Sequence, residues 1–281
     1  MRNVQKIGVK PRNGHIDIPA DAHTVFYRMH EQSGAAFADM LGNGGDLTLA
    51  ASGTGTPLAN AGYVTPDGTN HYLQRDVDDY LHALFRLDQE YGQILTAFDF
   101  YWDGGSTGTE CLFFAGVSNP ACGGWGLALN SVGQIVWVSR GIGASNHATS
   151  PFTGYALTSL GSQRISVLVE TIYKPASKVD ANLYVNGTAR VALTDINLLH
   201  NSGTAPYGSL QVIPGSTQAY SIGCRPTASA TRDWLLNSAA SNGRIGRFMA
   251  DRRARDTTLA QKVATELYLY QGEVPRVLVD A

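Results

Sequence analysis

The chain has 281 residues, a formal net charge of −2 at pH 7 and 16% charged residues, against about 25% in an average soluble protein. A net charge so close to zero excludes bulk electrostatic attraction to nucleic acid or to an anionic membrane surface. The longest apolar runs are of strand length, so no membrane span is expected. The low charge and the 31 glycines fit either a turn-rich β domain or a surface partly covered by neighbours in an assembly.

The first 22 residues contain Pro11 and Pro19 and show no sustained periodicity, which predicts an extended N-terminal arm. This arm is either a loose terminus or a segment that lies on a neighbouring subunit. It lacks the apolar stretch of a secretion signal, so we expect synthesis in a cytoplasm. Three cysteines are an odd number and are expected to be reduced, buried thiols: Cys111, Cys122 and Cys224.

From residue 23 onward, short apolar runs alternate with turns rich in Gly, Asn, Asp and Ser, as is typical of an antiparallel all-β sandwich. Residues 94–102 form the strongest predicted strand, with Ile94 and Phe98 on one side and Leu95 and Ala97 on the other. Further strands are expected over residues 25–29, 112–117, 126–129, 134–139, 164–172, 182–185, 210–213 and 220–223.

The sequence predicts one β-hairpin from the residues of its turn. Asn186-Gly187 stands between two apolar runs and favours a two-residue turn, because both turn positions need positive φ.

Residues 256–270 form the one convincing predicted helix. Leu259, Val263 and Leu267 are spaced four apart and would share one buried face, with Asp256 or Thr257 as the cap. The tail beyond residue 272 is expected to form another short strand or arm.

Several short motifs occur in a recognisable order: residues 25–34, the D-M-L-G-N-G and D-L-T-L stretches within residues 39–49, and residues 183–187, 221–223 and 243–246. In this order the chain resembles the laminin-G-like branch of the concanavalin A-like jelly rolls. The resemblance covers residues 23–272. It implies an all-β, antiparallel two-sheet jelly-roll sandwich with one short C-terminal helix, flanked by an arm (1–22) and a tail (273–281).

The same resemblance implies a calcium site at a sheet rim, for which the candidates are Asp39, Asn43 and Asp46. The alternative is a turn stabilised by Asx side chains. Trp102 and Trp234 flank loops and are candidates for stacking on a glycan, although a tryptophan at a strand end equally suits the rim of the core.

An arginine cluster precedes the predicted helix. Arg247, Arg252 and Arg253 are candidates for contacts with a partner, because guanidinium groups pair bidentately with carboxylates. The alternative is a solvated face neutralised by Asp251 and Asp256.

We expect a protein without enzymatic activity. A glucanase of this superfamily would use paired carboxylates in a Glu-x-Asp-x-x-Glu pattern, and no Glu-x-Asp occurs in the sequence. The resemblance implies a structural and binding module: a capsid decoration, tail or appendage protein of a tailed bacteriophage virion, made in the host cytoplasm. It would hold identical and different subunits together and contact host glycans. A stand-alone glycan-binding lectin is the alternative, followed by a glycoside hydrolase.

Overall fold

The computed structural model describes residues 23–29, 36–42, 47–51, 58–60, 63–65, 71–76, 79–85, 87, 92–102, 104, 108–119, 122–140, 148–157, 164–174, 178–197, 219–226, 232–233, 243–270 and 275–278. These residues form two large sheets and a small two-stranded one, β16–β17 (Arg225–Pro226 and Arg232–Asp233). The pairings between described strands are antiparallel. The predicted all-β, antiparallel two-sheet sandwich is therefore confirmed.

The first sheet, called sheet A, follows the order β14-β13-β12-β7-β18-β5-β4, and β1 also pairs with β18. Its strands are β1 (His23–Tyr27), β4 (Leu58–Asn60), β5 (Tyr63–Thr65), β7 (Gln93–Tyr101), β12 (Ile165–Lys174), β13 (Lys178–Val185), β14 (Thr188–Asn197) and β18 (Arg244–Arg253).

The second sheet, called sheet B, follows the order β11-β10-β9-β8-β15-β6-β3-β2. Its strands are β2 (Ala36–Phe37), β3 (Leu47–Ala51), β6 (His71–Asp76), β8 (Glu110–Asn119), β9 (Cys122–Leu129), β10 (Ile135–Arg140), β11 (Ala148–Pro151) and β15 (Ala219–Ile222).

The main core lies between the sheets and is rich in aromatic side chains. Phe113 of sheet B packs at 5.3 Å between ring centroids from Phe248 of sheet A. Helix α1 (Asp79–Phe85) adds Leu81, Leu84 and Phe85 to this core. The indole Nε1 of Trp125 donates to the Phe85 carbonyl at 2.8 Å, which ties sheet B to the end of α1.

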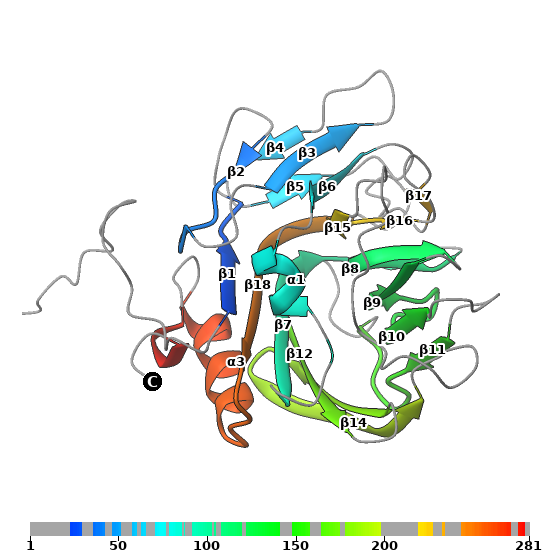
Figure 1. Ribbon diagram of the computed structural model, residues 1–281, viewed down its shortest axis with the longest axis vertical. Helices are drawn as coiled ribbons and strands as arrows, with labels where there is room; N and C mark the ends of the chain where they lie inside the picture. Colours follow the sequence, from blue (N-terminus) through cyan, green and yellow to red (C-terminus); the bar gives the residue numbers. More distant parts are fainter. Residues whose placement is uncertain are drawn as a thin grey trace, which may run out of the picture.

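Helix α3 (Leu259–Leu269) covers the outer face of sheet A, beside β18 and β1 (Figure 1). Its buried face is the predicted one, with Leu259, Val263 and Leu267. They pack on outward-facing residues of the strands, among them Phe26, Leu95, Leu168 and Met249. Sheet A is thus covered on both faces here, which explains why β7 is buried along nearly its whole length.

The exposed edge of β1 is closed by polar groups rather than by another long strand. The Tyr80 hydroxyl accepts from the Thr24 N–H at 2.6 Å and donates to the Thr24 carbonyl at 3.0 Å. Two residues on, Asp39 Oδ1 accepts from the Phe26 N–H at 2.9 Å, and the Met40 N–H donates to the Phe26 carbonyl at 2.8 Å. Capping of this kind leaves no row of free backbone groups for another chain to pair with.

Most sequence predictions of local structure are confirmed, and a few differ. Asn186 and Gly187 form the predicted turn, with φ of 49° and 74°. The predicted strands at residues 25–29, 94–102, 112–117, 126–129, 134–139, 164–172, 182–185 and 220–223 match β1, β7, β8, β9, β10, β12, β13 and β15, whereas residues 210–213 lie outside the described residues. No described helix is long and apolar enough to cross a membrane.

Helix α1 was not predicted, and the tail forms a 3-10 turn, η2 (Arg276–Leu278), in place of the expected strand or arm. Leu278 is buried against α3, which is why the tail takes a compact conformation there. Asp256 does not cap α3 directly. Its Oδ1 accepts from the N–H of Thr258, the residue just before the helix, at 2.8 Å. The predicted arm, residues 1–22, lies outside the described residues.

Candidate functional site

Three arginines of β18 fasten the helical elements to the sandwich. Arg247, Arg252 and Arg253 are only 3%, 1% and 7% exposed. Each donates to main-chain carbonyls of a different element: Arg247 to the end of α3, Arg252 to α1 and Arg253 to η2. The prediction that these arginines contact a partner is therefore wrong. The physical reason is that α3 and η2 cover the face expected to meet solvent, while Arg252 points between the sheets toward α1.

Arg247 of β18 lies opposite a buried carboxylate of β7, beside a register shift between the two strands. The register shifts between Ile245 and Phe248, so that Gly246 and Arg247 lie opposite Asp99 of β7. Arg247 keeps the alternation of Met249, which faces α3, and the extra residue of the bulge lets Ile245 face the main core like Phe248.

Asp99 Oδ2 receives two guanidinium groups, Arg247 Nε at 2.6 Å and Arg164 Nη1 at 2.9 Å. Arg247 also donates from Nη1 to the Tyr270 carbonyl at 2.7 Å and from Nη2 to the Leu267 carbonyl. The carbonyls at the end of a helix carry partial negative charge. These carbonyls and Asp99 therefore balance the charge of Arg247 together.

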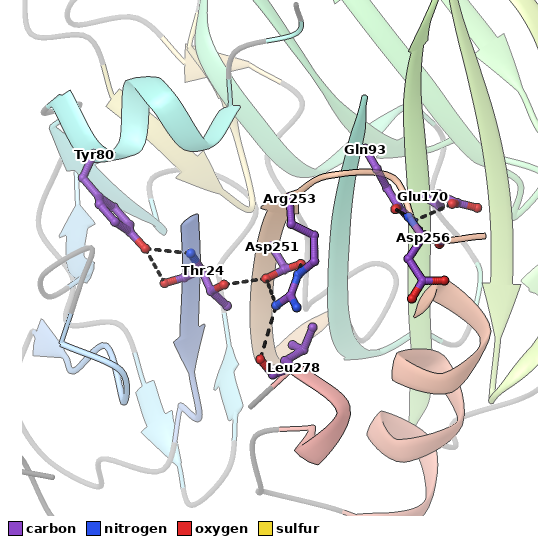
Figure 2. A network of polar contacts seen from close by, with 8 residues as sticks. All are labelled: Thr24, Tyr80, Gln93, Glu170, Asp251, Arg253, Asp256 and Leu278. Atoms are coloured by element: carbon purple, nitrogen blue, oxygen red, sulfur yellow. Dashed lines mark hydrogen bonds and ion pairs between the residues drawn. The ribbon is translucent and has the colours of Figure 1, made fainter. Parts of the chain in front are cut away.

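A second polar cluster holds the neighbouring turn η2 (Figure 2). Asp251 accepts from Arg253 through both oxygens at 2.8 Å, and Arg253 Nη2 donates to the Leu278 carbonyl at 3.3 Å. Asp251 Oδ1 also accepts from the Thr24 hydroxyl at 2.5 Å. Asp251 was correctly expected to neutralise an arginine, but the pair is buried rather than solvated.

The start of α3 is held by a third cluster, also drawn in Figure 2. Gln93 Oε1 accepts from the Asp256 N–H at 2.8 Å, and Gln93 Nε2 donates to Glu170 Oε1 at 2.7 Å. The other Glu170 oxygen accepts from Asn182 Nδ2 at 2.8 Å. Burial, aided by the neighbouring Glu170 carboxyl, raises the pKa of Tyr184 to about 12. Both ends of α3 are thus fixed to sheet A by polar contacts.

At its C-terminal end, α3 presents apolar side chains to solvent. Tyr268, Leu269 and Tyr270 are 44%, 60% and 49% exposed, and among the described residues only Val132 is a further exposed large apolar residue. The guanidinium carbon of Arg276 lies 5.9 Å from the centre of the Tyr270 ring. We call these four residues, Tyr268, Leu269, Tyr270 and Arg276, the helix-end surface. Concentrated apolar exposure on a soluble protein marks a contact region.

The backbone beneath this surface is fixed. Arg164 Nη2 donates to the Tyr268 carbonyl at 3.3 Å and Arg247 holds the Tyr270 carbonyl. On the other side, α3 packs on the hairpin tip, where a Cβ built on Gly187 would lie 3.5 Å from the Cβ of Tyr268. A rigidly held surface loses little conformational entropy when it binds.

Of the two tryptophan candidates for stacking on a glycan, only Trp102 lies among the described residues. Trp102 is 1% exposed and packs in the core between the sheets. Its ring faces are covered, so the rim-of-core alternative holds for Trp102 and the glycan-stacking prediction at that residue is wrong. Trp234 lies outside the described residues.

The calcium candidates are only partly covered by the structure. Asp39 is buried, and its Oδ1 accepts from the N–H groups of Phe26 and Leu41 at 2.9 and 3.1 Å, which makes it the side chain that closes the β1 edge. Asn43 and Asp46 lie outside the described residues. The calcium site stays a prediction.

Sequence reasoning did not single out the helix-end surface, although a signal was present. The last turn of the predicted helix reads Leu267-Tyr268-Leu269-Tyr270, which is apolar all round. A helix packed on one side cannot bury every face, so some of these side chains had to remain exposed.

The comparisons with known proteins identify the fold. No protein-family model and no curated protein matches the sequence. Solved structures do match. The Trypanosoma rangeli sialidase in complex with sialic acid has 14% identity and a TM-score of 0.55, over 87% of this chain and 33% of the sialidase. The receptor binding domain of botulinum neurotoxin mosaic serotype C/D has 11% identity and a TM-score of 0.53, over 88% of this chain and 50% of that domain.

These similarities show a concanavalin A-like β-sandwich, as the sequence resemblance implied. The chain spans about a third of the sialidase and half of the toxin domain. At so low an identity the similarity concerns the fold, since this kind of fold carries unrelated functions.

Proposed function

We propose that this chain is a non-enzymatic structural and binding module, a subunit of a larger particle such as a tailed bacteriophage virion, that contacts neighbouring subunits through the helix-end surface. The observation that carries the proposal is that Tyr268, Leu269 and Tyr270 are exposed together on a helix end whose backbone is fixed by Arg247 and Arg164. Tyrosine and arginine are typical of the residues that dominate protein interfaces.

The roles of three of the buried carboxylates support a module without catalysis. Asp99, Asp251 and Glu170 all have partners within the chain that orient α3 and η2. A glycosidase needs two carboxyl groups facing one another across a sugar-binding cleft. These three carboxylates are instead covered by the C-terminal elements, and their contacts hold those elements on the sandwich.

The experiment that tests this function uses particles purified from the organism that encodes the chain. We expect an antibody against the chain to label intact particles, and the chain to sediment with them in a density gradient. The isolated chain should leave β-glucans and alginate-like polymers intact. A chain that is found only outside particles, or that cleaves one of these polymers, would contradict the proposal.

A glycan-binding lectin is the second candidate, favoured by the exposed phenol rings of Tyr268 and Tyr270. Among proteins of similar fold are a sialidase solved with sialic acid and a toxin receptor binding domain. A glycan array distinguishes the two: a lectin would bind a defined sugar and lose that binding in Tyr270→Ala. Contact with host glycans by a virion subunit would give the same array result together with sedimentation in particles.

A further inference from the structure

None of the residues that the structure describes covers the helix-end surface. Leu269, at 60% exposure, is its most accessible member, with Tyr268 and Tyr270 on either side of it in the sequence. A cover for these side chains must therefore come from outside the described residues, and a second molecule can supply one. A branched aliphatic side chain is best buried by another apolar side chain, since it offers no flat face for a sugar ring to stack on. This observation favours a protein segment over a glycan.

Arg276 adds a positive charge to the surface. Its side chain is exposed and lies over the Tyr270 ring, and it forms no ion pair with any residue that the structure describes. A guanidinium group on an aromatic face still has donors directed outward, which suit a carboxylate. The complementary segment therefore carries a carboxylate next to apolar side chains.

The chain's own N-terminal arm contains such a segment. Residues 16–19 read Ile16-Asp17-Ile18-Pro19, and Asp17 is the only acidic residue among the first 20. Pro19 biases Ile18 toward an extended or polyproline II conformation. With about three residues per turn in polyproline II, Asp17 and one flanking isoleucine can face the same surface.

We propose that the helix-end surface receives residues 16–19 of the N-terminal arm of a second copy, with the second copy's Asp17 paired to Arg276 and an isoleucine against Leu269. This inference rests on the proposed function and names the partner of the same surface. The contact pairs one carboxylate with one guanidinium and apolar side chains with apolar side chains. Two copies can exchange arms reciprocally, or a ring of copies can pass each arm to the next.

The test is a charge exchange in the full-length chain, read as the dissociation constant of self-association by light scattering and analytical ultracentrifugation. Asp17→Arg and Arg276→Asp should each weaken self-association at least about tenfold, because each puts like charges together. The double variant, Asp17→Arg with Arg276→Asp, again brings opposite charges together, with the two positions exchanged, and should recover most of the lost affinity. Lys262→Asp is the matched control, because Lys262 is exposed on α3, and the change in charge equals that of Arg276→Asp.

A separate variant tests the apolar part of the proposed contact. Leu269→Ser should weaken self-association by a similar factor without changing the circular dichroism or melting temperature, since Leu269 is exposed. A wild-type chain that stays monomeric at all concentrations would overturn the inference. The inference would also be overturned if Asp17→Arg and Arg276→Asp had the same dissociation constant as Lys262→Asp. A double variant that self-associates no more tightly than the single variants would overturn it as well. In each of those cases sedimentation with particles still tests the proposed function separately. Binding of a glycan that requires Leu269 and Arg276 would also overturn the inference and assign the surface to a sugar.

Discussion

Asp99 and Arg247 lie 148 residues apart in the sequence and meet beneath α3, with 2.6 Å between Asp99 Oδ2 and Arg247 Nε. The pair is nearly inaccessible to solvent and does not stand alone, since Arg247 also reaches the carbonyls of Leu267 and Tyr270. A single side chain of β18 thus connects a central strand to the end of the helix that carries the exposed surface.

Replacing Arg247 by Met should lower the free energy of unfolding by about 3 kcal/mol, because it removes one of the two guanidinium groups that compensate the buried Asp99 carboxylate. Arg164 still pairs with Asp99 and limits the loss. Chemical denaturation measures the effect, and Arg255→Met, at an exposed position, is the control. A variant within about 0.5 kcal/mol of the wild type would mean that this ion pair contributes little to stability.

Raising the pH should destabilise the chain through Tyr184. Its pKa is about 12 in the folded protein against an ordinary value of 10. Between these two values the unfolded chain releases the phenol proton while the folded chain keeps it, so stability is full below pH 10 and falls as the pH rises toward 12.

Tyr184→Phe should therefore show a shallower loss of stability above pH 10, measured by denaturation at a series of pH values. Tyr268→Phe, at an exposed position, should follow the wild-type profile. Identical slopes in wild type and Tyr184→Phe would contradict the assigned cause.

A glycine of β9 should not tolerate even one added methyl group. A Cβ on Gly126 would collide with the carbonyl oxygen of Phe113 and lie 2.8 Å from the Phe114 Cα, whereas a Cβ on Gly108 meets nothing within 4 Å. Gly126→Ala should cost about 2 kcal/mol through overpacking against backbone that cannot move aside. Gly108→Ala should be neutral. Thermal unfolding compares the two, and equal melting temperatures would show that β8 and β9 separate at little cost.

Removing the Tyr80 hydroxyl should open the edge of β1. In Tyr80→Phe the N–H and carbonyl of Thr24 lose their hydrogen bonds to the Tyr80 hydroxyl, so amide exchange at Thr24 should accelerate about tenfold, which corresponds to about 1.4 kcal/mol. The amide of Phe26 is the internal control, because it donates to Asp39. Hydrogen exchange followed by NMR reads both sites. Unchanged protection at Thr24 would show that the edge is held by packing alone.

Local patterns in the sequence were sufficient to predict the β-sandwich. Alternation in residues 94–102 gave the two faces of β7, and Asn186-Gly187 gave the hairpin because few dipeptides accept two positive φ angles. The spacing of Leu259, Val263 and Leu267 gave the buried face of α3. These signals depend only on neighbours along the chain.

The role of the arginines depended on distant contacts. Arg247 and Arg253 read as surface residues because the sequence does not show which face of sheet A is covered by α3 and η2. Helix α1 was missed for a different reason. Leu81, Leu84 and Phe85 have helical spacing, but seven residues are too few for periodicity to outweigh the surrounding strand pattern.

The position of β18 has a consequence for biosynthesis. This strand lies between β7 and β1 in sheet A, yet it follows both of them in the sequence. Until residues 244–253 leave the ribosome, β1 has no ladder neighbour in β18, and α1 lacks the guanidinium that holds its Ala83 carbonyl. Closure of sheet A must therefore wait until β18 has been made, so that nascent chains expose the unpaired edges of β1 and β7 while the segments between β7 and β18 are translated.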